Sequence, residues 1–171
     1  DNEFAKETAI EAIEITQNRN QKNDLLRITS FMNLYGEDIF EKSLEIENNA
    51  NSYYKQDNFE EAKILYENLI ELIPANFIYK ENLAVCLFNL KDFAGSAKFL
   101  EEVESEGHIL DESQIFILGI SLYNINRISD SCDRLFESQR WGYEEATNAV
   151  NILCSNFLKW VILLFFPYQL Y

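Results

Sequence analysis

Three segments of the chain follow one pattern at a spacing of 34 or 35 residues, and this repetition constrains the fold more than any other feature. A small residue begins each copy and a second one follows twelve positions later, which gives the pairs Ala50 and Ala62, Ala84 and Ser96, and Gly119 and Ser131. Self-similarity with such a period is typical of solenoids, whose repeats bury their apolar faces by stacking on one another. Because small side chains let two helices come close, each copy is predicted to be a pair of crossing helices.

The composition and the apolar periodicity both favour helices joined by short loops. Gly (5) and Pro (2) are scarce in 171 residues, whereas sheet proteins need many turns built from these residues. Leu65, Leu69 and Leu72 recur at helical spacing. We predict helices over residues 39–56, 59–73, 77–90, 93–106, 112–125 and 128–139.

Residues that typically begin helices support these bounds. Asp57 with Glu60, and Asp111 with Gln114, have the spacing of a capping box, in which two side chains bond reciprocally to the first turn. Asn76 is the predicted N-cap of the helix that begins at residue 77.

The repeated pattern resembles the tetratricopeptide repeat. The first copy matches that family best, at Ala50, Tyr53, Phe59, Ala62, Tyr66 and Pro74. The second copy keeps Leu83, Ala84 and Phe93 but has Ser96 where alanine is usual, and the third keeps Leu118 and Gly119 but has Ile128 and Ser131. The resemblance covers residues 43–140. It implies an all-α fold, a right-handed α-solenoid of three helix pairs over residues 43–76, 77–111 and 112–140.

The two flanks of the repeats, residues 1–40 and 141–171, are predicted to be separate parts of the chain. Residues 1–40 are expected to form N-terminal helices, one around Phe4, Ile10 and Ile13 and another over 25–35 that ends at Gly36, with a polar loop at 17–24 between them. After the repeats we predict a C-terminal capping helix over 143–157, because the last repeat of a solenoid needs its apolar face covered.

An apolar tail over residues 157–171 is the most unusual segment. Its unbroken apolar run, residues 160–166, is much shorter than the roughly 20 residues that a membrane-spanning helix needs. Membrane contact through the tail is therefore not favoured. The tail is expected to dock on the solenoid, and contact with a partner or with another copy of the chain is the alternative.

The balance of charge narrows the classes of partner. Lys and Arg total 14 against 29 Asp and Glu, a formal net charge of −15. This balance argues against nucleic acid and anionic membrane surfaces, because both are bound through cationic contacts. It fits a basic partner, or simply a solvated acidic surface.

No pattern of catalytic or metal-binding residues occurs in the chain. Cys86, Cys132 and Cys154 match no metal or redox spacing and are predicted to be buried thiols, which favours a reducing compartment such as the cytoplasm. His108, the single histidine, is expected in a solvated loop. We therefore predict no enzyme activity, cofactor or metal. The chain begins at Asp1, so a fragment or a processed secretory form stays open.

The resemblance also implies a concave groove lined by the first helix of each pair. The implied positions are Leu44, Glu47, Asn51, Tyr54 and Lys55 in the first repeat, Ile78, Glu81, Val85, Phe88 and Asn89 in the second, and Ser113, Phe116, Ile120, Tyr123 and Asn124 in the third. Tyr54, Phe88 and Tyr123 occupy one repeat position, and aromatic side chains supply large contact areas in interfaces. Whether these three rings line the groove or pack in the core stays open.

The carboxylate clamp of the chaperone-binding members of this family is missing. Of the clamp residues only Asn51 is present, because Glu47 stands where lysine is needed and Val85 where asparagine is needed. Ser113 and Ile117 replace the basic pair of the third repeat. An acidic C-terminal peptide is therefore disfavoured as a ligand, and an apolar or extended segment with flanking basic residues fits better.

The sequence thus predicts a protein–protein interaction module, an adaptor or scaffold that holds a segment of a partner polypeptide. One alternative is a secretion chaperone, because the layout resembles the class II chaperones of bacterial type III secretion, which hold an apolar stretch of a translocator. Another alternative is a structural subunit of a large, membrane-associated assembly or an oligomer, with the flanks buried against neighbours.

Overall fold

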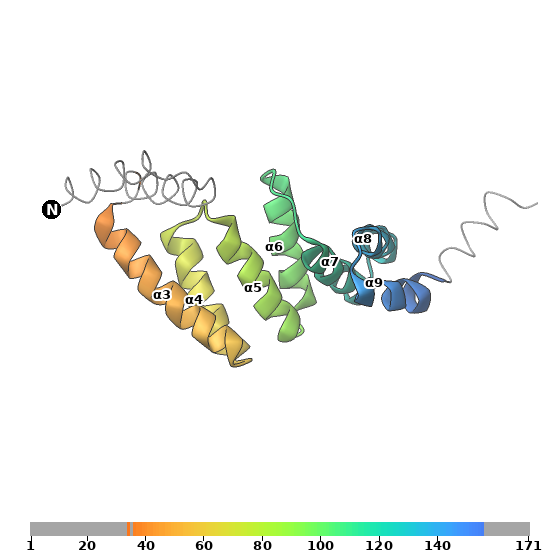
Figure 1. Ribbon diagram of the computed structural model, residues 1–171, viewed down its shortest axis with the longest axis horizontal. Helices are drawn as coiled ribbons and strands as arrows, with labels where there is room; N and C mark the ends of the chain where they lie inside the picture. The colour runs from red at the N-terminus through yellow and green to blue at the C-terminus, as the bar shows by residue number, and fades with distance from the viewer. Residues whose placement is uncertain (1–33, 35, 156–171) are drawn as a thin grey trace, which may run out of the picture. The chain divides into compact units, whose positions relative to one another are not determined.

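The structure is a computed structural model that describes residue 34 and residues 36–155 (Figure 1). Within this part all regular structure is helical, which confirms the predicted all-α fold of helix pairs. The helices are α3 (Glu37–Lys55), α4 (Phe59–Leu72), α5 (Phe77–Asn89), α6 (Phe93–Ser105), α7 (Glu112–Asn124), α8 (Ile128–Arg140), α9 (Glu144–Ala149) and the π-helical turn η1 (Val150–Cys154). No end of the six predicted repeat helices differs by more than two residues from these bounds.

The contacts divide the chain into two compact units, residues 1–49 and residues 50–171. This division falls inside α3 and coincides with neither of the predicted domain boundaries, near residues 40 and 140. Those boundaries stay predictions. The predicted N-terminal helices and the tail at 157–171 lie outside the described residues. Gly36, which was expected to end a helix, has a positive φ of +89° just before α3.

The small residues that begin each repeat copy, Ala50, Ala84 and Gly119, are buried, and Gly119 lies where α7 and α8 pack closely. A Cβ atom on Gly119 would lie 2.9 Å from the Leu135 side chain, so α7 and α8 pack too closely there for any larger residue. The hydroxyl of Ser131 donates a hydrogen bond of 2.7 Å to the carbonyl of Gly119 at the same crossing.

The two serines that depart from the family's alanine therefore have structural roles. Ser131 satisfies a buried carbonyl, as described above. Ser96 on α6 accepts a hydrogen bond of 3.3 Å from the hydroxyl of Ser121 on α7, and both side chains are buried. A buried hydroxyl is costly unless it is bonded, and each of these has a partner.

Two apolar clusters hold consecutive elements together. One joins α5, α6 and α7 and comprises Ala84, Ala97, Leu100, Val103, Leu110, Ile115, Leu118 and Leu122. The other joins α8 to the C-terminal elements and comprises Cys132, Leu135, Val150 and Cys154. The core is thus a row of clusters between neighbouring helices, as expected when each repeat packs on the next.

The turn inside each helix pair contains one residue in the left-handed conformation. Asp57, Lys91 and Asn126 have φ values of 57°, 65° and 66° and occupy equivalent repeat positions. The predicted capping box of Asp57 and Glu60 is therefore wrong. Asp57 forms the turn, and Asn58 is the N-cap of α4 without a side-chain hydrogen bond.

The other predicted helix starts are confirmed. The side chain of Asn76 accepts a hydrogen bond of 3.1 Å from the amide of Ile78. Asp111 and Gln114 form a complete capping box at the start of α7, in which the Gln114 side chain accepts from the Asp111 amide at 2.9 Å.

The C-terminal cap is helical from residue 144 to residue 155, within the bounds predicted for a single helix over 143–157. Six residues of α9 are followed by the five residues of η1. A disulfide between Cys132 of α8 and Cys154 of η1 ties this cap to the last repeat. The prediction of three buried thiols is thus wrong for two cysteines, because the fold brings together residues whose spacing matches no motif. Cys86 is a free buried thiol, and burial raises its pKa to about 12.

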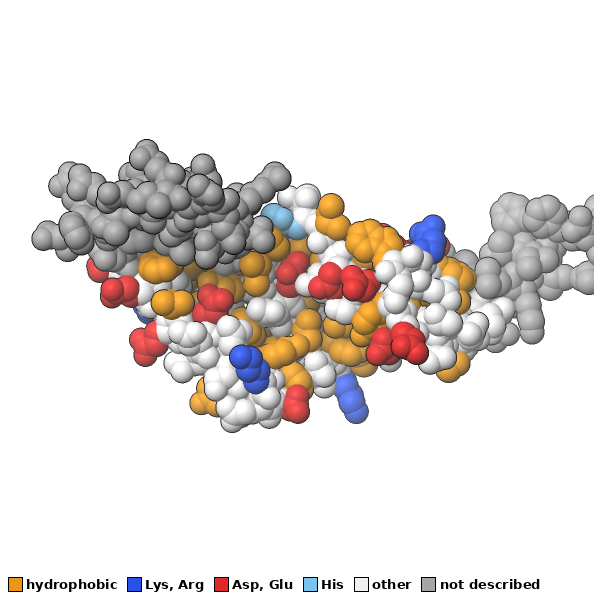
Figure 2. All heavy atoms as spheres, in the orientation of Figure 1, with side chains coloured by type: hydrophobic (Ala, Val, Ile, Leu, Met, Phe, Trp, Pro, Cys, Tyr) orange, Lys and Arg blue, Asp and Glu red, His pale blue; other side chains and the backbone are white. Residues whose placement is uncertain are grey.

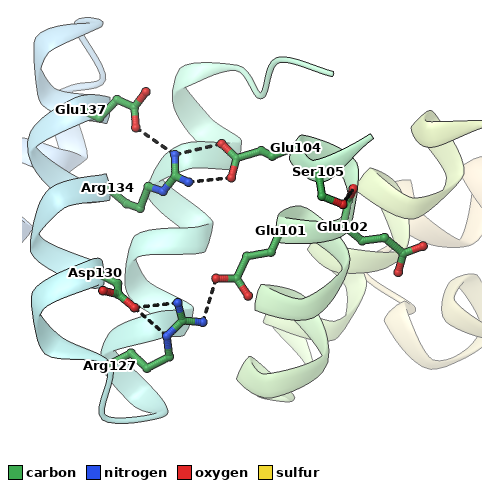
Figure 3. A network of polar contacts seen from close by, with 8 residues as sticks. All are labelled: Glu101, Glu102, Glu104, Ser105, Arg127, Asp130, Arg134 and Glu137. Atoms are coloured by element: carbon green, nitrogen blue, oxygen red, sulfur yellow. Dashed lines mark hydrogen bonds and ion pairs between the residues drawn. The ribbon is translucent and has the colours of Figure 1, made fainter. Parts of the chain in front are cut away.

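Ion pairs join the second helices of neighbouring repeats. In Figure 3, Arg127 reaches Glu101 of α6 at 2.7 Å and Asp130 at 2.6 Å. Arg134 of α8 binds both carboxylate oxygens of Glu104 of α6, at 2.9 and 2.7 Å, and also reaches Glu137 at 3.0 Å. Each guanidinium therefore pairs with one carboxylate of α8 and one of α6.

Candidate functional site

The predicted groove residues of α5 and α7 form two equivalent rows. Positions 81, 85 and 88 of α5 and positions 116, 120 and 123 of α7 have the spacing that places side chains on one helix face. The two helices contact each other directly. We call these six residues the groove stripe: Glu81, Val85, Phe88, Phe116, Ile120 and Tyr123. All six are half-buried, so they are neither sealed in the core nor fully solvated.

Two of the aromatic residues in the predicted ladder also pack within their own repeat. The Tyr54 ring meets the Phe59 ring edge-on with centroids 5.7 Å apart, and Phe88 meets Phe93 in the same way at 5.8 Å. At Tyr123 the equivalent neighbour is Ile128, so this pairing of rings is absent from the third repeat. Tyr54 and Phe88 therefore stabilise the helix pair and still keep part of their surface exposed.

The asparagines of the predicted site are held by local hydrogen bonds. The side-chain oxygen of Asn51 accepts a bond of 2.7 Å from the buried hydroxyl of Tyr66. Asn89 and Asn124 are exposed, and each donates a bond of 2.8 Å to the carbonyl four residues earlier on its own helix. Asn51 thus supports the fold, while Asn89 and Asn124 form an ordered polar edge beside the groove stripe.

The cap covers one end of the groove stripe. Phe116 and Ile120 pack against the cluster shared by α8, α9 and η1. The Phe116 ring also meets Tyr143, the N-cap residue of α9, with centroids 5.1 Å apart. Burial raises the pKa of Tyr143, and the nearby Glu145 raises it further. Sequence reasoning missed Tyr143, although its place at the start of the predicted capping helix was a usable signal.

Glu81 is the only charged member of the groove stripe. It accepts a hydrogen bond from the Gln114 side chain, which also completes the capping box of α7. Burial is the largest cause that raises the pKa of Glu81. The neighbouring Asp111 raises it too, whereas the bond from Gln114 and the nearby His108 lower it. His108 itself stacks on Phe77, with centroids 3.7 Å apart, and is not the fully solvated loop residue that was expected.

A separate polar cleft of about 810 Å³ lies along α6 and α8. It contains Arg127 and Arg134, whose ion pairs are described above, and also the exposed Arg140 and Asp133. None of its lining residues belongs to the groove stripe, and sequence reasoning did not predict it. Its charged walls largely neutralise one another.

The described residues contain neither a candidate metal site nor a candidate membrane span. Among them, no group of three or more His, Cys, Asp or Glu side chains is placed to hold a metal ion. None of the helices in residues 36–155 combines the length and the apolar character that crossing a membrane requires. Figure 2 shows instead that hydrophobic side chains reach the surface along the helices of the second unit, with acidic side chains among them.

Comparison with curated proteins gives one short similarity. No protein-family model matches the chain. A stretch of 58 residues is 39% identical to stress-induced-phosphoprotein 1 of Caenorhabditis elegans. The match covers 34% of this chain and 18% of that protein, so the chain spans less than a fifth of the relative's length.

Solved structures share the fold over most of the chain. The first tetratricopeptide-repeat domain of Spaghetti (RPAP3), bound to the HSP90 peptide SRMEEVD, is 20% identical with a TM-score of 0.58, over 69% of this chain and 94% of that chain. The N-terminal domain of stress-induced protein-1 from Caenorhabditis elegans is 25% identical with a TM-score of 0.53, over 68% and 98%. The repeat spacing of this chain, its helix pairs and these similarities together show that it has the fold of tetratricopeptide-repeat domains.

Proposed function

We propose that the chain is a non-catalytic interaction module that holds a segment of a partner polypeptide against the groove stripe. One observation carries the proposal: α5 and α7 touch and present equivalent rows of half-buried side chains that the core does not seal. Half-exposed aromatic and aliphatic groups on a rigid scaffold are typical of binding hot spots. The similar domain of RPAP3 is bound to a peptide, which supports the same general role.

The ligand of this chain is expected to be an apolar or extended segment, not an acidic C-terminal peptide. Asn51, the one clamp residue present, has its side-chain oxygen bonded to Tyr66. Val85 lacks the amide, and Ser113 and Ile117 lack the positive charge, that the clamp needs at these positions. The charge that the groove stripe does contain is negative, and it would repel a carboxylate.

Selection of peptides on the immobilised full chain tests this function. A library of random peptides displayed on phage should enrich apolar sequences, and the most enriched one is called the selected peptide. Its affinity, measured by fluorescence anisotropy, should fall about tenfold or more for Tyr123→Ala, as at a hot spot. The control is Ile64→Ser, because Ile64 is 54% exposed on α4, outside the stripe. Enrichment of nothing, or equal binding by both variants, would refute the function.

A class II secretion chaperone is a special case of this proposal, because a translocator segment would occupy the same stripe. A structural subunit is the second candidate, and exposed apolar residues in the cap and at the end of α8 favour it. Trp141 is 53% exposed and Ile152 is 74% exposed. Light scattering on the purified full chain checks this role, since a concentration-independent monomer with the cap intact would count against it.

A further inference from the structure

We propose that the partner segment carries one basic residue that pairs with Glu81, within a run of apolar residues that covers the remainder of the groove stripe. This inference rests on the proposed function and specifies the chemistry of the segment. The surface is the α5–α7 face, and the occupant is an apolar polypeptide segment with a single lysine or arginine at one place.

The repeat register shows that Glu81 interrupts an otherwise apolar surface. Positions 81, 85 and 88 of α5 correspond to positions 116, 120 and 123 of α7. Phe116 therefore occupies the position that Glu81 occupies in the repeat before it. The other five members of the stripe are aliphatic or aromatic, so the carboxylate marks one defined point along a bound segment.

The Glu81 carboxylate has no lysine or arginine partner in the described part of the chain. It is half-buried, and its charged form is disfavoured by that burial and by the nearby Asp111. The bond from Gln114 and the nearby His108 favour the charged form and offset these effects only in part. No ion pair among residues 36–155 includes it. Lys80, its neighbour in sequence, is buried and paired with Glu102 of α6 and with Glu106, the C-cap residue of α6. A cation supplied by the partner would therefore complete an ion pair that the fold does not supply, since Glu81 has only the Gln114 amide and the nearby His108 as favourable neighbours.

Charge complementarity at this point also works against the wrong ligand. A carboxylate on the partner that lies opposite Glu81 would be repelled in a partly desolvated site, where such repulsion is strong. The peptide SRMEEVD, bound by the similar domain of RPAP3, contains two consecutive glutamates. The net charge of −15 further favours approach of a basic segment.

Glu81 also has a structural contact, and the test variant has to preserve it. The Gln114 side chain bonds to Glu81 and to the Asp111 amide, so it joins α5 to the start of α7. Glu81→Gln removes the charge but keeps a side-chain oxygen that can accept from Gln114. Glu61→Gln makes the same change on the exposed surface of α4 and serves as the matched control.

The experiment repeats the phage-display selection on the wild-type chain, Glu81→Gln and Glu61→Gln, with thermal melts to confirm that all three fold equally. The wild type and Glu61→Gln should enrich apolar peptides that contain one lysine or arginine. Glu81→Gln should still enrich apolar peptides but lose that basic residue. In anisotropy, the selected peptide should bind Glu81→Gln about tenfold more weakly. The same peptide with its lysine changed to glutamine should bind both proteins equally.

The outcomes separate the two proposals. The pairing would be overturned if the wild type enriched apolar peptides without a preferred basic residue. It would also be overturned if Glu81→Gln enriched the basic residue as strongly as the wild type does. In both cases the binding function would stand. Enrichment of no peptide on any of the three proteins would overturn the binding function itself.

Discussion

The α5–α7 face and the α6–α8 face of the same repeats differ in whether their charged side chains form ion pairs within the chain. On α6–α8, Arg127 and Arg134 each bind two carboxylates, and one of each pair belongs to the neighbouring repeat. On α5–α7, the groove stripe leaves apolar rings half-exposed and one carboxylate without an ion pair among the described residues. A face whose charges are paired internally contributes to the fold, whereas a face with exposed apolar rings and a carboxylate outside any ion pair is suited to a partner.

The largest expected effect concerns the cap that closes the end of the groove stripe. The Cys132–Cys154 disulfide closes a loop with a sequence separation of 22. Changing both cysteines to serine should lower the free energy of unfolding by about 3 kcal/mol, because the unfolded chain loses that constraint. Urea denaturation with and without reductant measures this. Reductant should still lower the stability of Cys86→Ala, because its disulfide is intact, but it should not change the stability of the double variant. If reductant did not change the free energy of unfolding of the wild type, the cap would not depend on the disulfide.

The next effect separates binding from folding within the stripe. Phe88→Ala should lower the affinity for the selected peptide about as much as Tyr123→Ala, because both rings are expected to contact the same ligand. Only Phe88→Ala should also lower stability noticeably, by about 1–2 kcal/mol, since its ring packs edge-on against Phe93. Anisotropy and urea denaturation on the two variants give both quantities. Equal losses of stability would mean that Tyr123 is as much a core residue as Phe88.

On the opposite face the expected effect is smaller and confined to stability. Arg134→Gln breaks the bidentate contact with Glu104 and should lower the free energy of unfolding by about 0.5–1 kcal/mol, because the pair is partly exposed. Binding of the selected peptide should not change. Arg140→Gln is the control, since no ion pair within residues 36–155 includes Arg140. If Arg134→Gln lowered the affinity for the selected peptide, the cleft along α6 and α8 would be the binding surface.

The smallest effect is a pH dependence that originates at Glu81. Its pKa in the folded chain is raised, mainly by burial, so the unfolded chain ionises first as pH rises. Glu81 therefore favours folding most below its unfolded pKa, and this contribution is lost as pH rises through the folded value. The stability of Glu81→Gln should lack this decline, and subtracting the two pH profiles isolates it. Identical profiles would show that the carboxylate is well solvated.

The repeat helices were predictable because local signals and periodicity agree. Small residues at Ala50, Ala84 and Gly119 fixed the register, and Asn76 and Asp111 marked two helix starts. The capping box predicted at Asp57 was wrong because aspartate is favoured both as a helix N-cap and as a turn residue with a left-handed backbone. Only the backbone conformation distinguishes the two roles.

The site was less predictable than the fold because it depends on distant contacts. The register could place Val85 and Ile120 at equivalent positions, but it could not show that Asn51 is bonded to Tyr66, fifteen residues away. Nor could it pair Cys132 with Cys154, because their spacing is set by the cap. The cleft along α6 and α8 arises from side chains of several elements and has no local signature.

Hydrogen–deuterium exchange of the full chain, with and without the selected peptide, tests most directly whether the α5–α7 face is the binding surface. Bound peptide should slow exchange in peptic fragments that cover α5 and α7, and leave fragments of α6 and α8 unchanged. Protection confined to α6 and α8, around Arg127 and Arg134, would contradict the assignment of the groove stripe.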